Sequence, residues 1–177
     1  RRTPSSTVHR PRRTPRESVE PGTRRDGGLS QQAPRRPRSL YVAPMTLELI
    51  PLCTATVSLA ETINVSSTFL IGEVTGIRLE GERLHASMKG HAAADWLRVS
   101  PEGYGTLDVK VTVETDDGAV IHATYTGRLQ FDTMTVYATP LFHTGDERYA
   151  WLNRIQAVAK GTFTPEGTLI YEMYELR

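Results

Sequence analysis

The segment Leu107–Thr115 constrains the fold most strongly, because aliphatic and polar residues alternate along it without interruption. A period of two is the pattern of a β-strand that buries one face and exposes the other. Asp116-Asp117-Gly118 follows directly. An Asp-Gly pair favours a tight hairpin turn, since both residues tolerate the positive φ that the turn requires. The sequence therefore predicts a β-hairpin whose second strand runs from Val120 to Phe131.

The rest of the chain after Pro44 continues this pattern and predicts one all-β domain over residues 45–177. Turn signals recur about every 8–12 residues, as in sandwiches and barrels. Further strands are expected at 47–52, 54–59, 69–77, 83–88, 97–99, 135–142, 155–163 and 168–176. One short helical turn is expected within Gly145–Asn153, where two acids begin the segment and favour a helix N-terminus. About nine or ten strands predict a single closed antiparallel β-barrel, which leaves no exposed sheet edge.

Residues 1–44 differ from this domain in composition. They contain eleven Arg against three acids, a net charge of +8, and seven of the eleven prolines. Such a segment buries too little apolar surface to offset its ordering entropy, so we expect it to be disordered. One interpretation is an arm for nucleic acid or a membrane surface. The other is a start assigned too far upstream, with Met45 as the first residue of the protein.

Several functional classes are disfavoured by what the sequence lacks. Cys53 is the only cysteine, so no disulfide framework can form. No apolar run approaches the roughly 20 residues of a membrane-spanning helix, and a cytoplasmic protein is expected. The four histidines after Pro44 match no metal-ligand spacing, and no phosphate loop, Gly-x-Ser-x-Gly or His-Glu-x-x-His motif occurs. We therefore expect neither a metal nor a cofactor.

A set of aromatic and polar side chains supplies the candidate ligand pocket. Its members are Trp96, Phe142, Tyr149, Trp151, Asn153, Tyr171 and Glu175. Barrels of about eight strands can hold a small ligand, and ligand sites combine apolar walls with a few convergent polar groups. The alternative is an aromatic core whose hydroxyl and indole groups only satisfy one another.

Three further residues are candidates for chemistry in such a pocket: Asp95, Asp108 and Tyr125. A carboxylate in apolar surroundings has a raised pKa and can transfer protons, and a nearby tyrosine can stabilise a developing oxyanion. Asp108 lies on the polar side of the alternating strand. It would have this role only if that side faces the interior, and the sequence alone leaves both orientations open.

Five segments carry a resemblance to a known family. They are Asp95-Trp96, Thr115–Ile121 with Tyr125-Thr126-Gly127, Thr139–Gly145, Arg148–Asn153 and Tyr171–Glu175. The chain resembles, over about residues 47–176, the uncharacterised family called domain of unknown function 3237. The resemblance implies a lipocalin-like β-barrel, usually cytoplasmic and of bacterial or fungal origin. It also implies that some members act in natural-product pathways, including ring closures.

Three functions remain as hypotheses. The first is a barrel that binds a small hydrophobic or aromatic molecule without catalysis. The second is a cofactor-free acid–base enzyme, an isomerase or cyclase, acting on an aromatic or polyketide-like substrate. The third is nucleic-acid binding through residues 1–44. It ranks last because residues 45–177 carry a net charge of −7 and would repel phosphates. Homo-oligomerisation is expected only because barrels of this size often pair.

Overall fold

The computed structural model describes residues 46–177, so the predictions made for residues 1–44 lie outside the described residues. The described chain consists of eleven strands and one helix. The strands are β1 (Leu49–Leu59), β2 (Ile63–Ser66), β3 (Phe69–Glu80), β4 (His85–Met88), β5 (Ala94–Val99), β6 (Tyr104–Thr115), β7 (Val120–Gln130), β8 (Thr135–Ala138), β9 (Leu141–His143), β10 (Gln156–Phe163) and β11 (Leu169–Leu176). The helix η1 (Glu147–Arg154) is a 3₁₀-helix.

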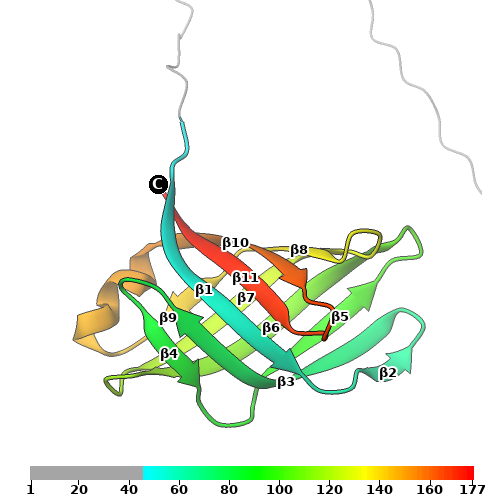
Figure 1. Ribbon diagram of the computed structural model, residues 1–177, viewed down its shortest axis with the longest axis horizontal. Coiled ribbons are helices and arrows are strands. Elements are labelled where there is room, and N and C mark those ends of the chain that lie inside the picture. The colour runs from blue at the N-terminus through cyan, green and yellow to red at the C-terminus, as the bar shows by residue number, and fades with distance from the viewer. Residues whose placement is uncertain (1–45) are drawn as a thin grey trace, which may run out of the picture. The chain divides into compact units, whose positions relative to one another are not determined.

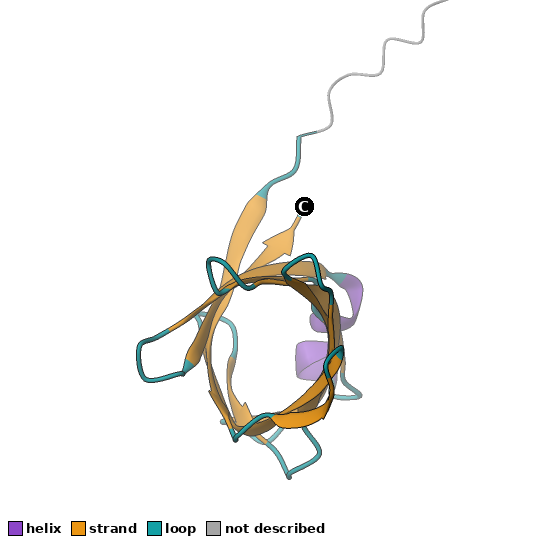
Figure 2. Ribbon diagram, turned by 90° about the vertical axis from the view of Figure 1, so that its right-hand side faces the viewer, coloured by secondary structure: helices purple, strands orange, loops and turns teal. Residues whose placement is uncertain are grey.

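Eight of the strands close into a ring in which every pairing is antiparallel. The order around the ring is β6-β5-β3-β1-β11-β10-β8-β7, and the β6–β7 hairpin closes it (Figure 1). Viewed along its axis, the ring is continuous, with η1 at the far end (Figure 2). The predicted closed antiparallel barrel is therefore confirmed, with eight strands in the ring and eleven in the described chain, where nine or ten were expected.

The remaining three strands are additions to this ring. β4 and β5 both lie between β3 and β6. β5 pairs with the first halves of these two strands, and β4 pairs with their last residues. β2 pairs only with β3, and β9 pairs only with β7.

The hairpin expected at Asp116-Asp117-Gly118 is present. Its turn depends on Gly118, which has a φ of +91°, a value that side-chain-bearing residues rarely adopt. The aliphatic residues of β6 all point into the barrel, where they are buried, and the alternating polar residues face outward. The alternation of this strand therefore determines which side faces the core.

Several predicted boundaries were wrong, and one strand was not predicted. The strand predicted at 97–99 begins at Ala94, and the strand predicted at 69–77 continues to Glu80. Residues 47–52 and 54–59 form the single strand β1, which contains a bulge at Leu52. The predicted strand 135–142 is two strands, because the chain turns away from β10 at Thr139–Pro140. β2 had no periodic signal, since all four of its residues are exposed.

The predicted helical turn is confirmed, and η1 lies at one end of the barrel, with the turns after β3 and β6. This end is called the closed end below. Asp146 caps it: its Oδ1 accepts a hydrogen bond from the Arg148 backbone N–H at 3.0 Å. Leu152 on the helix is fully buried with Leu84 and Ile121. The helix thus contributes an apolar side chain to the core at this end.

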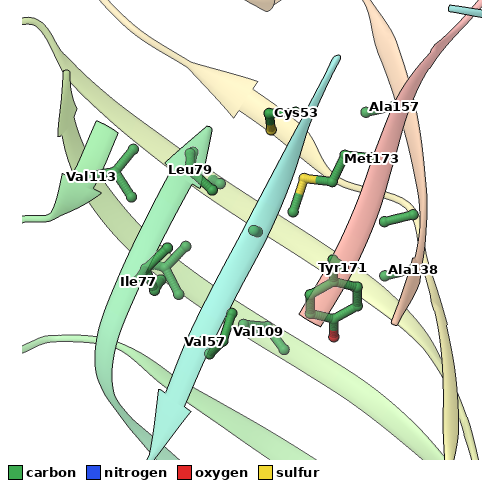
Figure 3. Packing of buried hydrophobic residues seen from close by; sticks show 14 of the residues in the cluster. Cys53, Val57, Ile77, Leu79, Val109, Val113, Ala138, Ala157, Tyr171 and Met173 are labelled. Atoms are coloured by element: carbon green, nitrogen blue, oxygen red, sulfur yellow. The ribbon is translucent and has the colours of Figure 1, made fainter. Parts of the chain in front are cut away.

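The core fills the barrel interior at the closed end and extends toward the opposite end. In Figure 3, Cys53 and Val57 of β1, Ile77 of β3, and Tyr171 and Met173 of β11 lie in one cluster. The described residues contain no helix long and apolar enough to cross a membrane.

Candidate ligand-binding cavity

The barrel encloses a cavity of about 250 Å³ toward the end opposite η1, where the turns after β1, β5, β7 and β10 lie. Its walls are mainly aliphatic and aromatic. The lining residues are Val57, Leu59, Thr62, Leu70, Gly72, Val74, Asp95, Leu97, Leu107, Val109, Tyr125, Leu129, Phe131, Met134, Val136, Phe163, Leu169 and Tyr171. This is the composition of a small-molecule site: an apolar surface with a few polar groups.

Tyr125 of β7 and Tyr171 of β11 form the floor of this cavity. Both also line a second, nearly filled void of about 30 Å³ below it, so the two rings separate the two spaces. Their ring centroids are 6.2 Å apart with an interplanar angle of 78°, an edge-to-face contact. The floor of the cavity is therefore a packed aromatic pair.

Small residues on the neighbouring strands give Tyr171 its position. Its partners across the sheet are Ala55 on β1 and Gly161 on β10. A Cβ atom at Gly161 would lie 2.6 Å from Tyr171 Cε1, closer than atoms can pack. The ring thus lies over the glycine.

Asp95 of β5 is the one carboxylate among the residues of the described chain that line the cavity. It shares the inward face of β5 with Leu97, and its neighbour on β3 is Gly72, which leaves space over the carboxyl group. Its Oδ1 accepts a hydrogen bond from the Asp108 backbone N–H at 3.0 Å. Burial raises the pKa of Asp95 from 3.8 to about 6. The group is therefore close to its titration midpoint near neutral pH.

The two tyrosine hydroxyls belong to the same electrostatic environment. Burial raises the pKa of Tyr125 and of Tyr171, and the charge of Asp95 raises both further. Three polar groups thus interact at the floor of an apolar cavity. Among residues 46–177, no Lys, Arg or His lines it, so none of these residues gives an ionised Asp95 a cationic partner there.

Two predicted site residues lie instead on the outer face of the barrel. The side chain of Asp108 is 59% exposed and accepts a hydrogen bond from Lys110 Nζ at 2.9 Å. Trp96 is 36% exposed, and the same Lys110 ammonium lies 5.1 Å from its ring centroid. Both face outward because residues alternate along β5 and β6 and the apolar set faces inward.

Four other predicted pocket residues lie at the closed end. The Tyr149 hydroxyl donates to Asp117 at 3.0 Å, and Trp151 lies under the Arg83 guanidinium, 4.4 Å from it. Asn153 makes two hydrogen bonds to the backbone of residue 144. Glu175 is 6% exposed and accepts hydrogen bonds from Arg83 at 2.7 Å and from residue 177 at 2.6 Å. These contacts join η1, the β3–β4 turn and β11.

Phe142 of β9 takes an intermediate position. It is buried and lines the small void below the tyrosine pair, and it does not line the cavity. Of the ten predicted site residues, the structure thus brings together Asp95, Tyr125 and Tyr171 in one cavity.

Two broader depressions, of about 630 and 580 Å³, lie outside the barrel. The first is lined by charged residues of the β3–β4 turn and the β1–β11 pair, and the second runs between β9 and β10. Both are open to solvent, so neither encloses a ligand as the cavity does. Within residues 46–177 no group of three or more His, Cys, Asp or Glu side chains is placed to hold a metal ion.

Comparison with known proteins places the chain in a family. A family model described as protein of unknown function (DUF3237) matches residues 47–176. The chain belongs to the DUF3237 family. The resemblance predicted from the sequence is confirmed over the same residues. No curated protein matches the chain in sequence.

Solved structures share the DUF3237 barrel. A β-barrel-like protein from Acinetobacter baumannii is 27% identical, with a TM-score of 0.69 over 76% of this chain and 99% of that one. A conserved protein of unknown function from Rhodopseudomonas palustris is 20% identical, with a TM-score of 0.69 over 76% and 100%. A structure described as an enzyme from Penicillium herquei is 22% identical, with a TM-score of 0.60 over 78% and 100%. The last two similarities establish the fold alone.

Sequence reasoning missed the apolar rim of this DUF3237 cavity. Phe131, Met134 and Phe163 line its upper part, and each lies at or beside the end of a strand. The available signal was their place directly next to turns, where small and polar residues usually dominate.

Proposed function

We propose that this protein binds a small, largely apolar molecule in the barrel cavity. The observation that carries the proposal is the arrangement of the cavity: about 250 Å³ of largely apolar space inside the barrel, with a carboxyl group and two tyrosines at its floor. A ligand with an apolar body and one polar end fits this arrangement, because its body contacts the walls while its polar end reaches the floor. The volume limits the ligand to roughly one or two rings.

Gly72 offers a direct test of occupancy. It lines the cavity, and a Cβ atom there would meet only Asp95 Cβ, at 4.0 Å. Gly72→Val should therefore fill part of the cavity without disturbing the wall. Gly76→Val is the matched control in the same strand, because its Cβ has ordinary contacts with Ser58 and Gly76 does not line the cavity.

Native mass spectrometry of the full chain, purified gently from its own cells, measures the occupancy. A small molecule should be retained by the wild type and by Gly76→Val and lost from Gly72→Val. Retention of the same molecule by Gly72→Val would place it elsewhere on the protein and contradict the proposal.

A second function, acid–base catalysis on the bound molecule, is favoured by the floor. A carboxyl group with a pKa of about 6 exchanges its proton readily near neutral pH, and two phenol hydroxyls beside it can donate to a developing oxyanion. The similar fold of a protein described as an enzyme is consistent with this. The chemistry would be proton transfer, as in isomerisation or cyclisation of an aromatic or polyketide-like substrate.

Asp95→Asn distinguishes binding from catalysis. The amide keeps the Oδ1 acceptor that the Asp108 N–H uses and cannot accept a proton. If catalysis occurs, wild-type protein in D₂O should exchange deuterium into the co-purified molecule, and Asp95→Asn should bind it without exchange. Equal exchange by both proteins would exclude Asp95 as the proton acceptor.

A further inference from the structure

The four carboxylates at the mouth of the barrel differ from the carboxylates at the closed end. The turns around the mouth carry one acid each at Glu61, Glu102, Asp132 and Glu166, and residues 60–62, 67–68, 100–103, 131–134 and 164–168 contain no Lys or Arg. None of these acids takes part in an ion pair among those of residues 46–177.

At the closed end several acids are ion-paired, whereas Glu82 and Glu147 take part in no ion pair among those of residues 46–177. Asp116 is paired with Arg78, both Asp117 and Asp146 with Arg148, and Glu175 with two arginines. The basic side chains on the strands nearest the mouth are engaged outside the barrel. Arg98 stacks on Phe69 and the residue 128 guanidinium on Tyr104, at 4.1 and 5.8 Å. Within residues 46–177 the entrance therefore has four acids against these two arginines, a net negative charge.

The interior of the barrel also carries negative charge. Of the described residues, Asp95 alone places a charged side chain in the cavity wall, and its hydrogen bond from the Asp108 N–H leaves Oδ2 available. An ionised carboxylate in an apolar space is costly unless a positive charge accompanies it. Among residues 46–177, no side chain that lines the cavity carries such a charge, so a ligand that carries one would complete the site.

The aromatic floor suits the same ligand. Tyr125 and Tyr171 line the cavity together with Asp95, and cations within about 6 Å of an aromatic ring are attracted to it. A phosphate or carboxylate ligand would meet repulsion both at the mouth and at the floor.

We infer that the ligand of this cavity is a small primary or secondary amine with an apolar or aromatic body, bound as its ammonium ion against Asp95. This inference rests on the proposed binding function and specifies the ligand class. The acids of the mouth attract the cation during approach, and Asp95 with the tyrosine pair holds it.

Three probes that share a phenyl group and differ in charge test the inference on the full chain. They are 2-phenylethylamine, 2-phenylethanol and phenylacetate, measured by isothermal titration calorimetry at pH 7.5 and low salt. The amine should bind about tenfold or more tightly than the alcohol, as expected for a charge-assisted contact in an apolar site. Phenylacetate should show no binding.

Two variants assign the selectivity to its parts. Asp95→Asn should bring the affinities for amine and alcohol to within about threefold of each other, since it removes the charge and keeps the shape. The triple variant Glu61→Gln/Asp132→Asn/Glu166→Gln should slow association of the amine at low salt, with little effect at high salt, because salt screens the mouth field. Asp108→Asn, outside the barrel, is the control and should change neither.

The outcomes separate the two proposals. If alcohol and amine bind equally well to the wild type, or if Asp95→Asn keeps the preference for the amine, the amine inference is wrong and the binding function stands. If none of the three probes binds and native mass spectrometry finds the cavity empty, both proposals fail.

Discussion

Replacing Asp95 by Asn separates the charge of this side chain from its structural role. The amide retains the oxygen that accepts the Asp108 N–H at 3.0 Å and has nearly the same volume. What changes is the ionisation. Burial raises the pKa of Asp95 from 3.8 to about 6, so the folded protein holds the proton more tightly than the unfolded chain does.

The sign and size of the effect follow from this difference. Below about pH 4 the carboxyl is protonated in both states, and ionisation costs nothing. Between about pH 4 and 6 the unfolded chain loses its proton first, so the free energy of unfolding falls as pH rises. A shift of about two units, at about 1.4 kcal/mol each, corresponds to about 2 to 3 kcal/mol above pH 6. Asp95→Asn removes this cost, so it should stabilise the protein at pH 7 and not at pH 4.

Urea denaturation of wild type and variant between pH 4 and pH 8, followed by tryptophan fluorescence, measures this difference. Trp96 lies on the outer face of β5 and Trp151 lies on η1, so the fluorescence reports on the barrel wall and on the closed end. Subtracting the two curves cancels the titration of all other groups. Asp108→Asn, an exposed control, should stay within about 0.5 kcal/mol of wild type. A pH-independent difference, or a variant less stable at pH 7 than at pH 4 relative to wild type, would refute the reasoning.

Three further predictions concern packing. Gly161→Ala should destabilise the barrel by about 1 to 3 kcal/mol in urea titrations, because its methyl group would overlap the Tyr171 ring; an unchanged midpoint would contradict the close contact. Leu152→Ala should cost about 2 to 5 kcal/mol, since this side chain is fully buried at the closed end, whereas Leu141→Ala on the surface should cost less than about 0.5. Cys53 should react with Ellman's reagent at pH 8 only after unfolding, because it is buried and burial raises the pKa of its thiol to about 12; rapid labelling of the folded protein would count against this.

The sequence predicted the class of fold because strand periodicity is a local property. The alternation from Leu107 to Thr115 and the turn at Gly118 are both visible in the chain and both appear in the barrel. The arrangement of the ring is not local. β4 and β5 follow one another in the same place between β3 and β6. This placement depends on pairings between strands that are distant in the sequence.

The candidate site was predicted in part for the same reason. Asp95 lay outside the strand predicted at 97–99 and was selected with Trp96, and the structure extends that strand back to Ala94 and turns Asp95 inward. Asp108 shares a face with Lys110 and is exposed. The aromatic residues of η1 were expected in the pocket because aromatic residues line such sites. The helix lies at the other end of the barrel, which composition does not reveal.

The pairing of β1 with β11 also governs how the barrel is made. The first and last described strands are neighbours, with Leu49 opposite Leu176, and Glu48 and Arg177 exchange two backbone hydrogen bonds. During synthesis, almost the whole domain leaves the ribosome before β11 is available to pair with β1. The edges of β1 and β10 that pair with β11 stay unpaired until then. Closing so long a loop makes folding slow, and open edges invite pairing with other chains. Removal of the last strand should therefore yield aggregation and not a smaller barrel.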